Sequence, residues 1–156
     1  MKITHYCNSF ISIKSGKSIL ACDPWVGKAD NNAWLSYPLH KNGEKLINGL
    51  SPNFIYISHL HNDHFDPKLL KKIKNKKDIK IIKKKFNNER LKNKIKELNF
   101  KNIIEIAPWK KFKLNDDFYV SIIPQETNNK DSIDREKYRL TNLGYTGDIN
   151  NKMYKS

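Results

Sequence analysis

Three of the five histidines in this sequence fall within six residues, His59-Leu60-His61-Asn62-Asp63-His64. Imidazole nitrogens and carboxylate oxygens are the ligands expected for zinc, and they also suit iron or manganese. In an extended loop His59 and His61 point the same way and can hold one ion, whereas Asp63 and His64 turn toward a neighbouring position that can hold a second. The competing interpretation is three surface histidines, but such clustering has no packing purpose. The spacing predicts a site for one or two metal ions.

The histidine segment lies between a predicted strand and a predicted helix. Residues 54–58 form an apolar run typical of a buried strand, and Asp66-Pro67 is a typical N-cap followed by proline at the first helical position, with a helix reaching Ile73. Side chains that project from a strand-to-helix loop meet at the rim of a sheet, where the backbone is rigid and the site stays open.

The other predicted elements indicate an α/β domain with a mixed sheet and helices on one face. Strands are predicted at 3–7, 10–13, 18–22, 79–82, 103–107 and 138–146, with a hairpin of residues 111–114 and 118–123. A second helix follows Asn87 or Asn88 and places Leu91, Ile95 and Leu98 on one face.

The stretch from residue 25 to about residue 50 contains glycine, asparagine and proline, and its apolar residues are unexpected there. Four of them, Trp34, Leu35, Tyr37 and Leu39, are too apolar for a free loop. We expect them to pack as a lid or short helix over the edge of the sheet.

Composition limits the class of protein. The chain has 156 residues, of which 38% are hydrophobic, enough for the core of one domain. Its apolar runs are only a few residues long, so no segment could span a bilayer, and we expect no membrane partner. Its beginning lacks the apolar stretch of a signal peptide, which favours a cytoplasmic location. Cys7 and Cys22 form no C-x-x-C pair and are predicted to be small buried residues in a reducing compartment.

The formal net charge of +14 raises the question of nucleic-acid binding. However, 27 of the 30 basic residues are lysine and only three are arginine, the residue that phosphate and base readers favour. Lysine, asparagine and isoleucine have A/T-rich codons, so genome composition can explain the bias. Ten of the 18 residues from Lys68 to Lys85 are lysine, and we interpret them as solvated faces of a helix and a strand rather than a polyanion site.

Beyond the chemistry of its residues, the segment His59 to His64 resembles the signature of the metallo-β-lactamase superfamily. Together with Asp23-Pro24-Trp25 and Ala33-Trp34-Leu35, it resembles the branch that includes the metallo-β-lactamase-like part of CMP-N-acetylneuraminate hydroxylases and, more distantly, ascorbate-6-phosphate lactonases. The resemblance is closest over residues 18 to 70 and thinner to about residue 148. It implies an αβ/βα sandwich, of which residues 1–156 would form mainly the N-terminal half, as one incomplete domain.

Carried over by position, the resemblance implies a role for each residue of the motif. His59 and His61 would bind a first metal ion and Asp63 and His64 a second, with Asp63 also orienting or deprotonating the attacking water. Gly147-Asp148 is similar to the later Gly-Asp of the superfamily, whose carboxylate bridges the ions, although Gly-Asp is also common in turns.

The chain departs from the superfamily pattern after the motif. No histidine follows His64, although the family usually supplies another after the strand that here ends at Ile123-Pro124, and Glu126 is the oxygen ligand that could replace it. Asp23 is expected near the ions but outside their ligand set. The superfamily domain is normally much longer, so the chain resembles a form truncated at the C-terminus. We therefore expect it to bind closer to one ion than two and to show little turnover. We also expect it to aggregate or dimerise through apolar side chains exposed around Ile55 and Ile57.

The function that the resemblance implies is metal-dependent hydrolysis. Metal-bound hydroxide would attack an ester, lactone or phosphoester in a small molecule such as a sugar or phosphorylated metabolite. Two alternatives stay open: a protein related to the CMP-sialic acid hydroxylase oxygenases, or a non-catalytic remnant with a basic, polyanion-binding surface. The hydroxylases also carry a Rieske segment with cysteine and histidine ligands, and nothing in this sequence matches it.

The composition argument makes a prediction about DNA. If codon bias explains the lysines, the chain should bind DNA weakly, without sequence preference and with a steep dependence on salt. Fluorescence anisotropy with labelled duplexes across a salt series measures this. Submicromolar binding that persists at physiological salt would contradict the interpretation.

Overall fold

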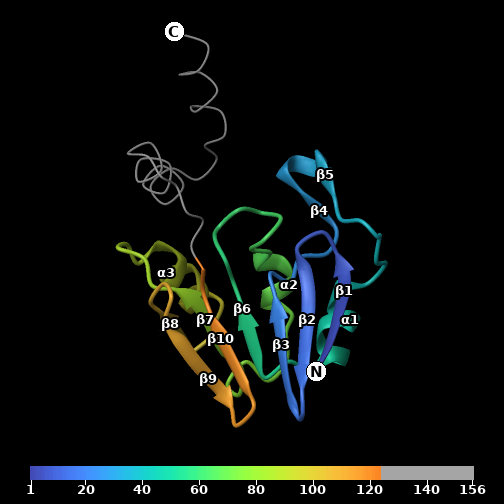
Figure 1. The fold of residues 1–156 in the computed structure, drawn as a ribbon. Helices are drawn as coiled ribbons and strands as arrows, with labels where there is room; N and C mark the ends of the chain where they lie inside the picture. The colour runs from blue at the N-terminus through green and yellow to red at the C-terminus, as the bar shows by residue number, and fades with distance from the viewer. Residues whose placement is uncertain (124–156) are drawn as a thin grey trace, which may run out of the picture. The chain divides into compact units, whose positions relative to one another are not determined.

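The fold of the described residues, 1–123 of this computed structural model, is built on one mixed sheet of six strands (Figure 1). The strands lie in the order β1-β2-β3-β6-β7-β8. The first three form an antiparallel meander, and β3, β6, β7 and β8 run parallel to one another. Their bounds are β1 (Lys2–Cys7), β2 (Phe10–Ser15), β3 (Ser18–Cys22), β6 (Phe54–Tyr56), β7 (Lys80–Lys84) and β8 (Asn102–Ile106).

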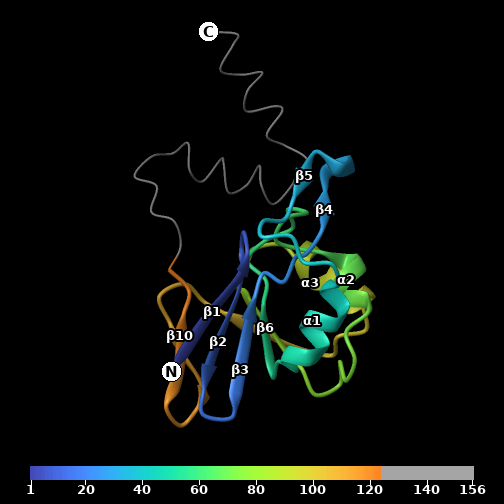
Figure 2. The same ribbon diagram turned by 90° about the vertical axis from the view of Figure 1, so that its right-hand side faces the viewer.

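Three helices connect the parallel strands and cover one face of the sheet (Figure 2). They are α1 (Gly43–Leu50), α2 (Pro67–Lys71) and α3 (Arg90–Glu97). Ile55 and Ile57 are fully buried in the core between the sheet and these helices, so the expectation that they are exposed is wrong. The reason is that their side chains point to the helical face. Within residues 1–123 no helix has the length and apolarity needed to cross a membrane.

The opposite face of the sheet carries a second, smaller core beneath a hairpin. This hairpin consists of β9 (Lys111–Asn115) and β10 (Phe118–Ser121), and Phe118 packs from it onto the sheet with Leu20 and Ile82. A cavity of about 210 Å³ lies between this hairpin and the sheet, lined by Cys22, Tyr56 and Ile122 among others. Ile123, at the rim of this cavity, is 70% exposed.

Several predicted elements are confirmed, and one helix was missed. The hairpin forms around residues 115–117 as expected, and Leu91 and Ile95 are buried on one face of α3. Helix α1 was not predicted because its glycines lie in a stretch rich in loop-forming residues. It begins after Asn42, whose side chain accepts a hydrogen bond from the Lys45 amide. The strand predicted at 138–146 lies outside the described residues.

The four apolar residues between 34 and 39 do not pack over the sheet edge. Two of them form a strand of a short hairpin and the other two follow it. The hairpin consists of β4 (Lys28–Ala29) and β5 (Trp34–Leu35), joined by the 3₁₀ turn η1 (Asp30–Asn32). Each of these side chains is at least 52% exposed, so the prediction that they pack as a lid is wrong. The sequence pattern indicated burial, but Ser36 takes the buried position of this segment instead.

The lysine-rich stretch also holds one side chain that is not solvated. Lys83 is fully buried and pairs with Glu105 on the neighbouring strand β8, while its ammonium lies 5.2 Å from the centre of the Phe86 ring. Glu105 also contacts Lys92 of α3 at 2.8 Å, so one carboxylate joins two strands and a helix. Hydrogen bonds from Lys83 and Lys92 lower the pKa of Glu105 from 4.5 to about 2.

Replacing this carboxylate should destabilise the fold in a pH-dependent way. Glu105→Gln leaves the buried Lys83 ammonium without its charged partner, and we expect a loss of about 1–2 kcal/mol at pH 7, because solvent screens part of the pair. Since the folded-state pKa is depressed, this stabilisation is complete above pH 4.5 and is lost as the pH falls to about 2.

Urea unfolding of both proteins between pH 2 and pH 7 measures the difference. Glu97→Gln is the matched control, because Glu97 pairs with Lys94 at 2.8 Å on the exposed surface of α3 and should cost little. An unchanged midpoint for Glu105→Gln at pH 7 would contradict the role given to this carboxylate.

Candidate metal centre

The loop that carries the histidines leaves the carboxyl-terminal end of β6 and is anchored at both ends. Ile57 is fully buried and its amide donates to Ile82 of β7 at 3.0 Å, whereas Phe65 at the other end is 6% exposed. The amides of His64 and Phe65 both donate to the His61 carbonyl, which closes a turn inside the loop. The Asp66 side chain then accepts from the Leu69 amide and starts α2, as the sequence predicted. The loop therefore holds its side chains on a fixed backbone.

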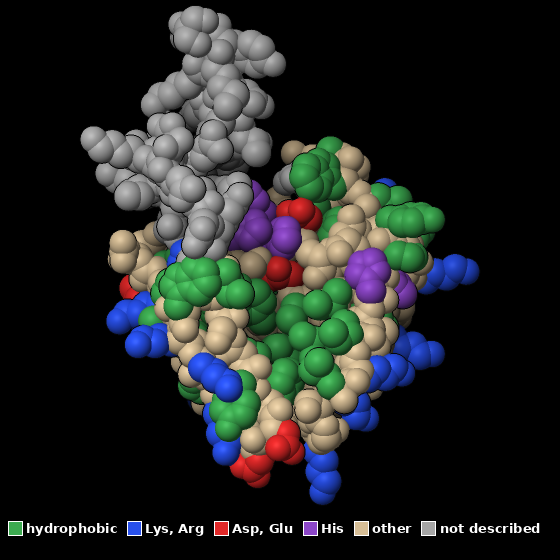
Figure 3. Space-filling view, viewed as in Figure 1, with side chains coloured by type: hydrophobic (Ala, Val, Ile, Leu, Met, Phe, Trp, Pro, Cys, Tyr) green, Lys and Arg blue, Asp and Glu red, His purple; other side chains and the backbone are tan. Residues whose placement is uncertain are grey.

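The structure brings the four motif residues together. The ring centres of His59 and His61 lie 4.5 Å apart, and the ring centres of His59 and His64 lie 4.3 Å apart. Nε2 of His59 is 2.9 Å from Nδ1 of His61, and Nε2 of His64 is 3.6 Å from a carboxylate oxygen of Asp63. Figure 3 shows histidine and acidic side chains gathered on this edge of the molecule.

These donors fit a metal ion as two pairs. Two nitrogen ligands of one tetrahedral zinc ion lie about 3.3 Å apart, since each Zn–N bond is about 2.0–2.1 Å long. Both donor separations are within a few tenths of an ångström of that value. No three histidine, cysteine, aspartate or glutamate side chains of residues 1–123 form a ready ligand set. The described residues therefore bring these donors together in pairs.

Asp23 orients the histidines from outside these pairs. It ends β3, which is the neighbour of β6, and is 7% exposed. One carboxylate oxygen accepts from the Ser58 amide at 2.7 Å, and the other accepts from the Ser58 hydroxyl at 2.6 Å and from Nδ1 of His64 at 2.8 Å. A carboxylate bound to one ring nitrogen directs the other ring nitrogen toward a metal.

The same network determines which nitrogen of His59 faces His61. The Ser58 hydroxyl donates its proton to Asp23, so its oxygen accepts from Nδ1 of His59 at 2.9 Å. Nε2 of His59 then carries the lone pair that faces His61. Burial lowers the pKa of His64, but the hydrogen bond to Asp23 and the charges of Asp23 and Asp63 raise it above its ordinary value overall.

The sequence-based predictions of the site have different outcomes. His59, His61, Asp63 and His64 lie together, and Asp23 contacts His64 directly. The predicted ligand Asp148 and the substitute ligand Glu126 lie outside the described residues. Sequence reasoning missed two contributors, Ser58 and Ser9, and the Ser9 hydroxyl donates to the Asp63 carbonyl at 2.6 Å. Ser9 is 54 residues from its partner, so no local pattern could reveal it.

Comparisons with known proteins begin with sequence. No protein family model matches the chain. It is 31% identical over 106 residues to a "Putative Rieske 2Fe-2S iron-sulfur protein" of Mycolicibacterium smegmatis, which covers 67% of this chain and 20% of that protein. It is 35% identical over 68 residues to the cytidine monophosphate-N-acetylneuraminic acid hydroxylase of Asterias rubens, covering 42% of this chain and 10% of the hydroxylase. The chain thus spans about a fifth or less of these relatives' length.

The comparison of structures concerns the fold. A possible metal-dependent hydrolase from Veillonella parvula superposes with a TM-score of 0.52 at 17% sequence identity, covering 73% of this chain and 45% of that chain. The chain has the mixed α/β architecture of the metallo-β-lactamase fold, with helices on one face of a mixed sheet.

The Asp23 network makes a prediction about stability. Asp23→Ala removes the acceptor of three hydrogen bonds at a nearly buried position, which leaves the Ser58 amide unpaired. We expect the free energy of unfolding to fall by about 2–3 kcal/mol, measured by urea titration without added metal. Asp116→Ala is the control, because Asp116 is 96% exposed and should change stability by less than about 0.5 kcal/mol. Equal effects of the two substitutions would contradict the role of Asp23.

Proposed function

We propose that this chain carries the metal-binding loop of a metal-dependent hydrolase. The observation that carries the proposal is a hydrogen-bond network behind two of the histidines. Asp23 binds Nδ1 of His64, and Ser58 binds Nδ1 of His59. Nε2 of His59 then faces His61, and Nε2 of His64 faces Asp63. Structural histidines need no such arrangement, whereas metal-binding histidines are typically held in this way. The fold shared with a possible metal-dependent hydrolase supports the same reading.

In this proposal each residue of the loop has a stated role. His59 and His61 hold one ion, and Asp63 and His64 hold a second or complete the first. Bound zinc, or iron or manganese in its place, supplies Lewis-acid activation of water near neutral pH. Asp63 is half-buried beside His64, where its carboxylate can orient a water molecule and accept its proton. Asp23 keeps His64 in the required orientation and does not contact the substrate.

The substrate we propose is a small molecule with an ester, lactone or phosphoester bond, such as a sugar derivative or a phosphorylated metabolite. Such bonds break by attack of an activated water on an electrophilic carbon or phosphorus atom. The loop lies at the carboxyl-terminal edge of parallel strands, the edge at which α/β proteins place their ligands.

A second candidate function rests on the sequence relatives, which are named as a Rieske iron–sulfur protein and a hydroxylase. This chain would then be the metallo-β-lactamase-like part of an oxygenase-related protein. A Rieske cluster needs two cysteine and two histidine ligands. Cys7 is fully buried and donates to the Trp25 carbonyl, whereas Cys22 lies at the cavity on the opposite face of the sheet. Cys7 and Cys22 therefore cannot bind one iron–sulfur cluster together. In this second candidate function the cluster ligands would come from another polypeptide segment.

Metal content tests the proposal directly. The purified chain should contain zinc or a similar ion, and changing His59 and His61 together to alanine should abolish stoichiometric binding, because the first donor pair is then removed. Elemental analysis and calorimetric titration with zinc measure this.

The matched control is the pair His5→Ala and His40→Ala, which removes the two histidines outside the motif. His5 contacts the Asn8 carbonyl and His40 the Tyr6 carbonyl, so neither belongs to the centre. The control should bind metal like the original chain. Unchanged metal content in the His59 and His61 variant would refute the assignment of this loop.

A further inference from the structure

The second strand of the β4–β5 hairpin and the chain just after it carry four exposed apolar side chains. Residues 1–123 expose nine large apolar side chains, and four of these lie within six consecutive residues. We call these four the apolar tip: Trp34 (53% exposed), Leu35 (52%), Tyr37 (79%) and Leu39 (60%). Large apolar side chains gathered on a surface mark a site of interaction. Figures 1 and 2 both show this hairpin projecting beyond the end of the sheet where the histidine loop lies.

The backbone of this segment holds the tip in its exposed position. Ser36 is fully buried between Leu35 and Tyr37, its amide donates to the Gly27 carbonyl at 2.8 Å, and its hydroxyl accepts from the Gly27 amide at 2.9 Å. The backbone of Tyr37 is held from the other side by Asn8, through its side chain and its amide. The exposure is therefore a property of the folded chain, and the side chains are already arranged for a partner.

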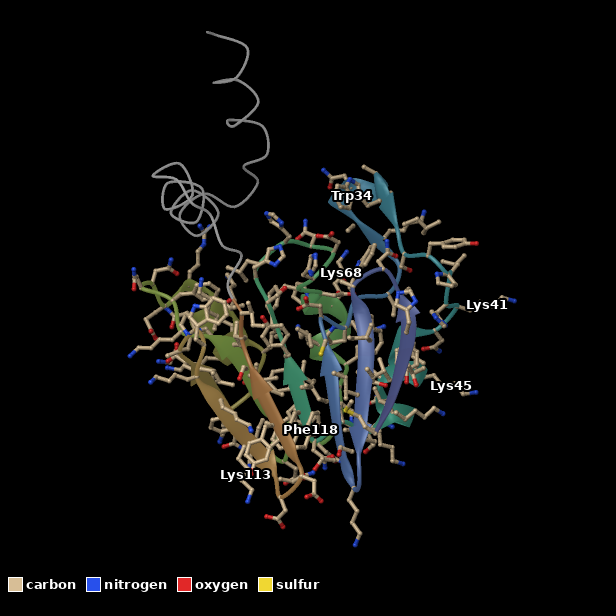
Figure 4. All side chains as sticks on the ribbon, viewed as in Figure 1. Trp34, Lys41, Lys45, Lys68, Lys113 and Phe118 are labelled. Carbon is tan, nitrogen blue, oxygen red and sulfur yellow. The ribbon has the colours of Figure 1, made fainter. Side chains whose placement is uncertain are left out.

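Lysines flank the tip. Lys28 is exposed and is paired across the hairpin with Leu35, and Lys41 and Lys45 are exposed just after it in the chain. Figure 4 labels Trp34 at the end of the hairpin, with Lys41 below it along the chain and Lys45 further away, on α1. In the same stretch Glu44 is 3.6 Å from Lys72, which offsets its charge. Lys28 and Lys41, which precede and follow the tip in the chain, thus favour an anionic partner.

We infer that the apolar tip and its lysines dock on the surface of an anionic lipid bilayer. Tryptophan and tyrosine favour the interface between headgroups and acyl chains, leucine side chains insert beside them, and lysines contact anionic headgroups. A protein partner is the less favoured occupant, because protein interfaces are depleted in lysine and enriched in arginine. This surface-bound mode needs no spanning helix. It departs from the expectation of no membrane partner, which rested only on the shortness of the apolar runs.

Docking in this way would bring the edge with the histidine loop close to the bilayer. The Asn8 contact to Tyr37 and the neighbouring Ser9 contact to Asp63 tie the tip and the loop to one turn between β1 and β2. The inference does not depend on metal, because the tip and the lysines contain none of the motif residues.

Co-sedimentation with vesicles tests the inference on the full chain of 156 residues. Vesicles of phosphatidylcholine with about 30% phosphatidylglycerol should bind the chain, and pure phosphatidylcholine should bind it much less. Changing Trp34 and Leu35 together to serine should lower the partition coefficient about tenfold. Trp109→Ser is the matched control, because Trp109 is 58% exposed and lies outside the tip. Near-UV circular dichroism shows that each variant is folded.

A second pair of variants distinguishes the contribution of the lysines near the tip to vesicle binding from that of the overall positive charge. Lys28→Gln with Lys41→Gln should weaken binding to anionic vesicles, whereas Lys110→Gln with Lys113→Gln, which changes the same number of exposed lysines elsewhere, should not. Equal binding of the serine variant and the original chain would overturn the inference, because the net charge alone would then explain it. Absence of vesicle binding would also overturn it, as would a dimer in solution that the serine variant dissociates, since the tip would then bind a second copy.

Discussion

The carboxylate of Asp23 accepts three hydrogen bonds at the point where β3 ends beside the chain leaving β6. Two parallel strands bring it there, because the Asp23 amide also donates to the Tyr56 carbonyl at 2.9 Å and fixes the register of the two chain ends. A nearly buried carboxylate is tolerated only when its oxygens are satisfied. Ser58 and His64 donate hydrogen bonds to these oxygens, and the same hydrogen bonds orient the rings of the histidine cluster. The stability of this edge and the geometry of the centre therefore depend on the same atoms.

Three loops at this edge of the sheet hold one another. The turn between β1 and β2 contributes Ser9, which binds the backbone of Asp63, and Asn8, which binds Tyr37. The β4–β5 hairpin and the histidine loop are thus connected through one short turn. This explains how a segment with four exposed apolar side chains can keep a defined backbone. Only two contacts, from Tyr37 to Asn8 and from Ser9 to Asp63, therefore separate the exposed apolar side chains from the candidate metal centre.

The two faces of the sheet differ in how they are covered. The helical face is packed with fully buried side chains such as Ile55 and Ile81, while the other face has only the β9–β10 hairpin as cover within residues 1–123. The register aligns Ile13, Leu20 and Phe54 as one row across three strands of this second face. This row is continuous with the core beneath the hairpin, to which Leu20 and Phe54 belong. The described part of the chain therefore has one complete layer of helices and a second, smaller layer.

Local patterns in the sequence determined much of this architecture. The spacing of the three histidines, the Asp66-Pro67 start of α2 and the turn at residues 115–117 each depend on neighbouring residues, so they could be predicted without coordinates. The faces of α3 followed from periodicity for the same reason. Asp23 and the histidine motif could be placed near one another only through a family resemblance, since 41 residues separate Asp23 from His64.

Tertiary structure alone decided the remaining features, because they depend on contacts between distant residues. Lys83 lies in a run of lysines that indicated a solvated surface, yet its pairing with Glu105 on the next strand makes burial possible. Ser9 is an ordinary turn residue until the fold brings it to Asp63. The residues between 34 and 39 have the composition of a buried segment, but the hydrogen bonds of Ser36 and Asn8 direct their side chains outward. The sequence thus determined the chemistry of the loop. Tertiary contacts determined which of its ring nitrogens face one another, and which surfaces lie beside the loop.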